Sequence, residues 1–122
     1  MRFMILVKAN KETEAGAAPE KSVLAAITKY HEQLVKAGVL LDSCALHPSS
    51  KATRIKFANG TRTWIDGPFD DSELIAEYTI IQVRSTEEAI EWVRRYPAPY
   101  GDKADGEIEI RQLLCPTDLT TH

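Results

Sequence analysis

The stretch RFMILVK (residues 2–8) decides the fold, because the five residues from Phe3 to Val7 are all apolar. A strand with one face in water would alternate apolar and polar residues. The unbroken run therefore predicts a central strand that is covered on both faces. The chain has few helices with which to cover two faces, so a second copy of the chain is the natural cover for the other one. We therefore expect a homodimer.

An amphipathic helix is predicted after a polar loop over residues 11–18. Pro19 suits the first turn of this helix, and Gly38 supplies its C-terminal stop. At 100° per residue, the apolar positions fall within an arc of about 140°. His31 stands inside this stripe, where a leucine would pack best. The stripe consists of Val23, Leu24, Ile27, Tyr30, His31, Leu34 and Val35.

A strand over residues 39–46 is followed by a predicted β-hairpin. Residues 54–57 and 62–65 are expected to be its two strands, with Asn59-Gly60 between them. Asn-Gly is the strongest short hairpin signal, because both residues tolerate a positive φ.

The second half of the chain contains another strand, a helix and a last strand. The β-branched residues 77–83 predict the strand, and Ser85 with Glu88 forms a capping box at the start of the helix. That helix is expected to end before Pro97. Residues 107–111 alternate as the last strand.

This order of elements predicts a ferredoxin-like α+β domain, β-α-β-β-α-β with an inserted hairpin, an antiparallel sheet and both helices on one face. We expect a single domain over residues 1–116 and a polar C-terminal tail over residues 117–122. The helix-free face of the sheet is expected to pair with a second copy.

The composition of the chain indicates which binding partners and which cellular location to expect. The net charge of −3 does not indicate binding to nucleic acid or to an anionic membrane. No apolar run is long enough to span a bilayer. The apolar run near Met1 is too short for a signal peptide. Cys44 and Cys115 are isolated and predict two reduced, mostly buried thiols. We therefore expect a cytoplasmic protein with no metal site and no cofactor.

His31 is the first candidate for chemistry, since an imidazole titrates near neutrality and can act as acid, base or ligand. The alternative is a histidine at the edge of the core, hydrogen-bonded to a backbone carbonyl. A lone histidine, with no second histidine at i+4 and no cysteine nearby, makes a poor metal site.

Asp66 is the second candidate, in the turn Asp66-Gly67-Pro68-Phe69. Its carboxylate is either a local turn former that accepts backbone N–H bonds, or a rigid group that orients His31 and sets its tautomer. The two roles are compatible. Asp42, on the strand after the first helix, competes as the partner of His31.

The Asp66–Phe69 tetrapeptide, the helix around residues 89–92, the stop at Pro97 and the strand within residues 106–111 together resemble the YciI-like, DGPF-motif proteins over nearly the whole chain. The resemblance implies a ferredoxin-like protomer that pairs into a dimeric α+β barrel, with a cleft holding a histidine and an aspartate as acid–base residues. His31 falls at the position of the family's helix histidine. The family's aspartate precedes a proline after the second helix, where this chain has Tyr96 before Pro97.

These observations favour a cofactor-independent acid–base enzyme, isomerase-like or lyase-like, acting on a small organic molecule. His31 and Asp66 are its expected catalytic residues, and the expected substrate-binding residues are Gly67, Pro68, Phe69 and Tyr96. The alternative is a non-catalytic dimer that binds a small molecule or has a regulatory role. An enzyme requires His31 to line a hollow that solvent reaches, with a carboxylate close to its ring.

Overall fold

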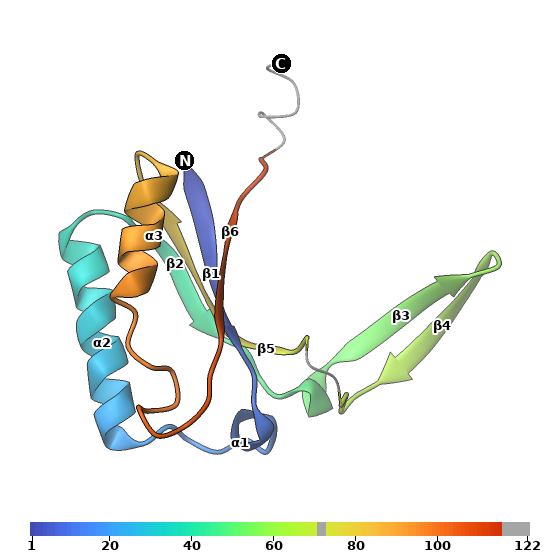
Figure 1. Ribbon diagram of the computed structural model, residues 1–122. Helices are drawn as coiled ribbons and strands as arrows, with labels where there is room; N and C mark the ends of the chain where they lie inside the picture. Colours follow the sequence, from blue (N-terminus) through green and yellow to red (C-terminus); the bar gives the residue numbers. More distant parts are fainter. Residues whose placement is uncertain (71–72, 116–122) are drawn as a thin grey trace.

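Strand β1 (Arg2–Lys8) lies inside a four-stranded sheet, as its unbroken apolar run predicts. It pairs with β5 (Ile75–Gln82) on one side and with β6 (Ile108–Gln112) on the other. Strand β2 (Leu40–Ala45) pairs with the far edge of β5, so the order is β2-β5-β1-β6 with every neighbouring pair antiparallel. This order and direction confirm the predicted ferredoxin-like α+β fold. The computed structural model describes residues 1–70 and 73–115 (Figure 1).

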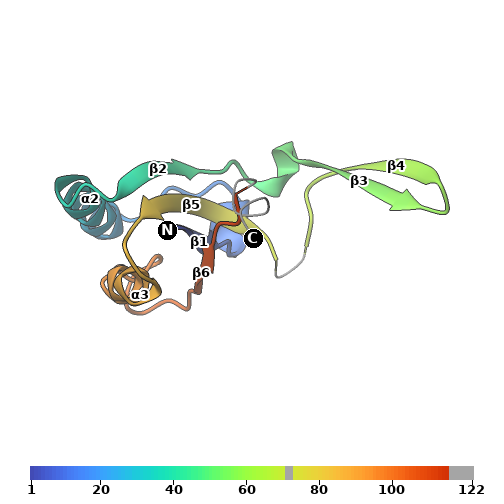
Figure 2. The same cartoon turned by 90° about the horizontal axis from the view of Figure 1, so that it is seen from above.

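Helices α2 (Lys21–Lys36) and α3 (Thr86–Arg94) lie on one side of this sheet (Figure 2). Alternate residues of β1 face them, and Ile5 is fully buried opposite Thr79 and Ile110. Burial of these apolar side chains stabilises the sheet–helix contact. The buried core comprises Phe3, Ile5, Val7, Tyr30, Leu34, Val39, Ile81, Val83, Ala89, Trp92 and Tyr96.

The helix-free face of the sheet presents the intervening residues of the same strands. On β1 these include Met4 and Leu6, which lie opposite Ile80 and Tyr78 of β5. Met4, Tyr78 and Ile80 are partly exposed, whereas Leu6 is 9% exposed. This face is therefore apolar at its centre, although none of the helices within residues 1–70 and 73–115 covers it in Figure 2.

The predicted hairpin is confirmed, with β3 (Thr53–Ala58) and β4 (Thr61–Asp66) forming a separate two-stranded sheet. Asn59 and Gly60 turn the chain with φ angles of 51° and 76°. The hairpin projects away from the rest of the chain (Figure 1).

Two short helical segments lie where the sequence predicted loops. Helix α1 (Lys11–Glu14) is held by a reciprocal cap, in which Asn10 Oδ1 accepts from the Thr13 N–H and Thr13 Oγ1 accepts from the Asn10 N–H, both at 2.9 Å. The 3₁₀ segment η1 (Ser49–Lys51) precedes the hairpin. Segments this short carry too few residues for a periodic apolar pattern.

The ends of the longer helices differ in detail from the prediction. Glu20 is the N-cap of α2, so Pro19 precedes the helix instead of lying in its first turn. At α3, Ser85 Oγ accepts from the Glu88 N–H as predicted, but the Glu88 carboxylate accepts from the Arg84 N–H. The donor to the Glu88 carboxylate is therefore Arg84, the residue before the N-cap, and not Ser85 as in a regular capping box.

Burial corrects two further expectations. Only part of the apolar stripe of α2 faces the core, because Leu24 and Val35 are exposed. Cys44 is also exposed, since it points to the helix-free face at the edge strand β2. The predicted tail over residues 117–122 lies outside the described residues.

No helix within residues 1–70 and 73–115 combines the length and the apolar character needed to cross a bilayer. The cytoplasmic location stays a prediction.

The Asp66–Phe69 turn joins the base of the hairpin to η1 and α1. The Gly67 N–H donates to the Ala52 carbonyl at 2.9 Å, and the Phe69 N–H donates to Ser49 Oγ at 2.9 Å. The Glu14 carboxylate accepts from both the N–H and the hydroxyl of buried Ser49. A Cβ on Gly67 would collide with the Ser49 carbonyl oxygen, so the turn requires glycine for close backbone approach.

We expect Gly67→Ala to lower the free energy of unfolding by about 2–3 kcal/mol, because backbone atoms of η1 must move to admit the methyl group. Urea unfolding measures this change. Gly38→Ala is the control, since Gly38 has open space around its Cα and a φ of 72°, and its cost should be only about 1 kcal/mol. Equal losses in the two variants would contradict the steric argument.

Candidate functional site

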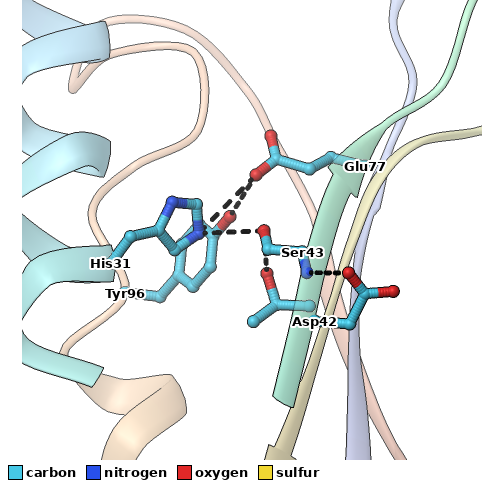
Figure 3. Close-up of polar contacts among 6 residues, drawn as sticks. His31, Asp42, Ser43, Glu77 and Tyr96 are labelled. Atoms are coloured by element: carbon cyan, nitrogen blue, oxygen red, sulfur yellow. Dashed lines mark hydrogen bonds and ion pairs between the residues drawn. The ribbon is translucent and has the colours of Figure 1, made fainter. Parts of the chain in front are cut away.

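His31 points from α2 towards the end of the sheet where β2 and β5 lie side by side (Figure 3). Its Nε2 atom lies 3.4 Å from Ser43 Oγ and 3.9 Å from Glu77 Oε1. The side chains of His31 and Glu77 are 24% and 22% exposed. The imidazole therefore faces a carboxylate and a hydroxyl while part of its ring stays open to solvent.

Strand register explains why these polar groups gather. Ser43 pairs with Thr79, and the next position on the same face pairs Ala45 with Glu77. Successive side chains alternate between the faces of a strand, so Ser43, Thr79 and Glu77 all point to the helix side. Ser43 Oγ lies 3.2 Å from Thr79 Oγ1, and Thr79 is 1% exposed. This hydroxyl pair links the site to the core.

Tyr96 forms the other wall of the site. It follows α3, and its hydroxyl donates to Glu77 Oε1 at 3.5 Å. Its ring lies 4.8 Å from that of Tyr30, centroid to centroid, and the Tyr30 hydroxyl donates to the Trp92 carbonyl at 2.6 Å. Both tyrosines are buried, so their rings are held in place by packing.

Burial raises the pKa of the carboxyl and hydroxyl groups of this site. It raises the pKa of Glu77 above its usual value, while the nearby His31 and the hydrogen bond from Tyr96 oppose that rise. Burial also raises the pKa of Tyr30 to about 12 and lifts that of Tyr96 further from neutrality. Both phenols are therefore hydrogen-bond donors at neutral pH, and a proton is held more readily by Glu77 than by an exposed glutamate.

Solvent reaches His31 from the outer side of α2. His31 borders a shallow, open depression of about 380 Å³ on the surface of α2, together with Thr28, Glu32, Val35 and Lys36. The histidine is therefore not sealed against a backbone carbonyl. Within the part of the chain that the structure describes, no three His, Cys, Asp or Glu side chains gather as a group able to hold a metal ion.

The expected pairing of Asp66 with His31 is replaced by the contact with Glu77. Asp66 ends β4 at the base of the hairpin, where its Oδ1 accepts from Thr53 Oγ1 at 3.0 Å. Asp42, the competing candidate, accepts from the Tyr78 hydroxyl at 3.0 Å and from the Ser43 N–H at 2.9 Å. It faces the other side of the sheet from His31, because its cross-strand partner is Ile80. A catalytic role of Asp66 stays a prediction, without the contact that motivated it.

The predicted substrate-binding residues divide into two groups. Tyr96 belongs to the cluster around His31, through its bond with Glu77. Gly67 and Phe69 are bonded to the segment around η1, and the Phe69 ring lies 3.9 Å beneath the Arg54 guanidinium. The geometry of the turn gives these residues a structural role, and substrate binding by Gly67, Pro68 and Phe69 stays a prediction.

The profile of the YCII-related domain matches residues 1–114. The chain belongs to the YCII-related family. This match confirms the resemblance carried by the DGPF tetrapeptide and the elements around it. No curated protein matches the chain. In this YCII-related chain, the hydroxyl of Tyr96, the residue before Pro97, contacts the Glu77 carboxylate that β5 supplies.

Sequence reasoning missed Glu77, Ser43 and Thr79. The sequence of β5 contains a signal for Glu77, because Glu77 lies two and four residues before Thr79 and Ile81 and so shares their buried face of the strand. A glutamate on the core-facing phase of a strand needs a polar partner, because burying an unpaired charge is costly. The sequence does not reveal this role directly, because Glu77 is the first residue of the predicted strand 77–83 and the core face becomes apparent only from the register.

We expect His31→Gln to raise the pKa of Glu77 further, because the variant removes the positive charge that favours the carboxylate. The titration of the Glu77 carboxyl carbon by ¹³C NMR measures this shift. His47→Gln is the control, since His47 lies in the exposed segment after β2. An unchanged Glu77 titration in His31→Gln would show that the two groups are not electrostatically coupled.

The same burial predicts how Glu77 affects stability. Because its pKa is raised in the folded chain, the ionised carboxylate is less favourable folded than unfolded, and stability from this group is lost as the pH rises through the raised pKa. We therefore expect Glu77→Gln to gain stability relative to the parent chain between pH 4 and pH 8, measured by urea unfolding. Glu12→Gln is the control, since Glu12 is an exposed residue of α1. A relative loss of stability over this range would contradict the sign.

Proposed function

We propose that this YCII-related protein is a cofactor-independent acid–base enzyme, isomerase-like or lyase-like, acting on a small organic molecule through His31 and Glu77. The observation that carries the proposal is the place of the imidazole, which borders a shallow, open depression on one side and lies 3.9 Å from a half-buried carboxylate on the other. A histidine that serves packing alone needs neither feature.

The contacts of the ring suggest how the proton moves. Nε2 faces Ser43 and Glu77, so a proton on Nε2 is held by these oxygens and the lone pair lies on Nδ1. Nδ1 is then the base that takes a proton from the substrate, and the Glu77 carboxylate stabilises the imidazolium that results. The separations of 3.4 and 3.9 Å are long, as catalytic hydrogen bonds often are before a ligand binds.

Tyr96 supports the pair by donating to Glu77 Oε1 from beside His31, as Figure 3 shows. Tyr96 is buried, so in this proposal it positions the carboxylate that faces His31 through its protonated hydroxyl. In this proposal the β5 carboxylate takes the part that the resemblance assigns to an aspartate after the second helix.

The proposal includes a homodimer. The helix-free face carries Met4, Leu6, Tyr78 and Ile80 at its centre, and burial of such a face against a second copy would stabilise both. A sheet face of this kind is ordinarily covered in water-exposed proteins.

Acid–base isomerisation and β-elimination of small carbonyl compounds both begin with the removal of a proton from the carbon beside the carbonyl group. Exchange of that proton for deuterium, followed by ¹H NMR over a panel of small keto acids and enol lactones in D₂O, therefore tests the proposal without a known product. We expect exchange with the parent chain and a loss of about 100-fold or more in His31→Gln. Glu77→Gln should lose activity as well, because the imidazolium loses its counter-charge.

His47→Gln and Glu12→Gln are the matched controls for these two variants, since both residues are exposed, and they should keep the exchange rate of the parent chain. The binding or regulatory alternative gives a different result. In that case panel compounds bind with no exchange, and His31→Gln changes affinity by no more than about 1 kcal/mol. Exchange that survives His31→Gln would refute the assignment of the base.

A further inference from the structure

The hairpin has one strongly apolar side. We call residues 53–66 the arm. In its register Ile55 lies opposite Trp64 and Phe57 lies opposite Arg62, and cross-strand partners share a face. Ile55, Phe57 and Trp64 therefore lie on the same side of the arm, with exposed fractions of 39%, 68% and 69%. Arg62 stacks on the Phe57 ring at 4.9 Å, so the side is apolar with one cation on it.

Within the described residues, the strands of the arm pair only with each other. A two-stranded hairpin in water is marginally stable by itself, and large exposed aromatic side chains in a cluster mark an interaction surface. Trp64 and Phe57 thus lie in water on an element that needs a further contact.

The direction of the arm limits where that contact lies. Figures 1 and 2 both show the arm leaving the chain on the side away from α2 and α3, beyond the end of the sheet. It does not fold back over its own helix-free face. A molecule packed on that face would lie beside the arm.

Charge indicates which kind of molecule fits. The arm holds the cations Arg54, Lys56 and Arg62, and its one acidic residue, Asp66, lies at its base. The arm therefore has a net charge of +2, which leaves −5 for the rest of a chain whose net charge is −3. Another copy of this chain attracts the arm electrostatically, whereas a nucleic acid or an anionic membrane would be repelled by the rest of the molecule.

We infer that the arm clasps a second copy of this chain, with the Ile55, Phe57 and Trp64 side closing against the body of the partner. This inference rests on the homodimer included in the proposed function and adds an interaction surface to it. When two copies pack through their helix-free faces, each arm extends along the other copy. Two arms then bury their aromatic side chains in one symmetric assembly.

The double variant Phe57→Ser/Trp64→Ser tests this surface. We expect its dimer dissociation constant, measured by sedimentation equilibrium, to rise at least tenfold over that of the parent chain, because buried aromatic anchors dominate interface energetics. Thr63→Ser is the matched control. Thr63 precedes Trp64 on β4 and points to the other side of the arm, so this variant should dimerise like the parent chain.

A second measurement needs no variant. Trp92 is 7% exposed and Trp64 is 69% exposed, so acrylamide quenching of the parent chain reports mainly on Trp64. We expect quenching to fall as dimer forms with rising protein concentration. Two results together would overturn the arm contact and leave the homodimer standing. They are an unchanged dissociation constant in the double variant and full quenching of Trp64 in the dimeric parent chain. A parent chain that stays monomeric would overturn both. Protection of Trp64 by anionic phospholipid vesicles, and not by dimerisation, would overturn the arm contact in favour of a membrane surface.

Discussion

The register in which β1 pairs with β5, with Ile5 opposite Thr79, is the constraint on which the fold and the site both depend. It places alternate residues of β5 on the helix side, where Thr79 and Ile81 are buried in the core. The same alternation brings Glu77 to that side and leaves Tyr78 and Ile80 on the other. A slip of one residue would exchange the two sets, because side chains alternate between faces. One register therefore sets the core, the site and the helix-free face together.

The site is built by adding polar groups to the end of an apolar core. Ser43 and Thr79 form a hydroxyl pair at its inner end, and Glu77 stands between His31 and Tyr96. Partial burial makes the carboxylate harder to ionise, and the neighbouring imidazole opposes that effect. An imidazole and a carboxylate that lie close together and are both partly open to solvent are the parts that proton transfer to a small molecule needs.

The DGPF turn has a structural role, because it holds the base of the arm against η1. Gly67 approaches the Ser49 backbone closely, and Phe69 is held by the Ser49 hydroxyl. Glu14 completes the joint by accepting from Ser49. The tetrapeptide thus fixes the base of the arm to the body of the chain, which connects a family signature to the direction in which the arm projects.

Most of the fold could be predicted from local patterns. The apolar run of β1, the stripe of α2, Asn59-Gly60 and the Ser85 cap each act over a few residues, and their order leaves the ferredoxin-like arrangement as the natural solution. The prediction was less accurate where contacts are distant. Leu24 and Val35 of the α2 stripe are exposed. Helix α1 depends on a reciprocal cap and is too short to give a periodic signal.

The candidate site shows the same division. The sequence alone determined that His31 is the notable imidazole, since a polar ring inside an apolar stripe is a local fact. Only the tertiary structure decided its partner, because Glu77 is 46 residues further along the chain and meets His31 through the packing of α2 on β5. Asp66 was the attractive choice on local grounds, yet its turn belongs to the arm. Local chemistry determines which side chains are unusual, while strand register and helix packing determine which of them meet.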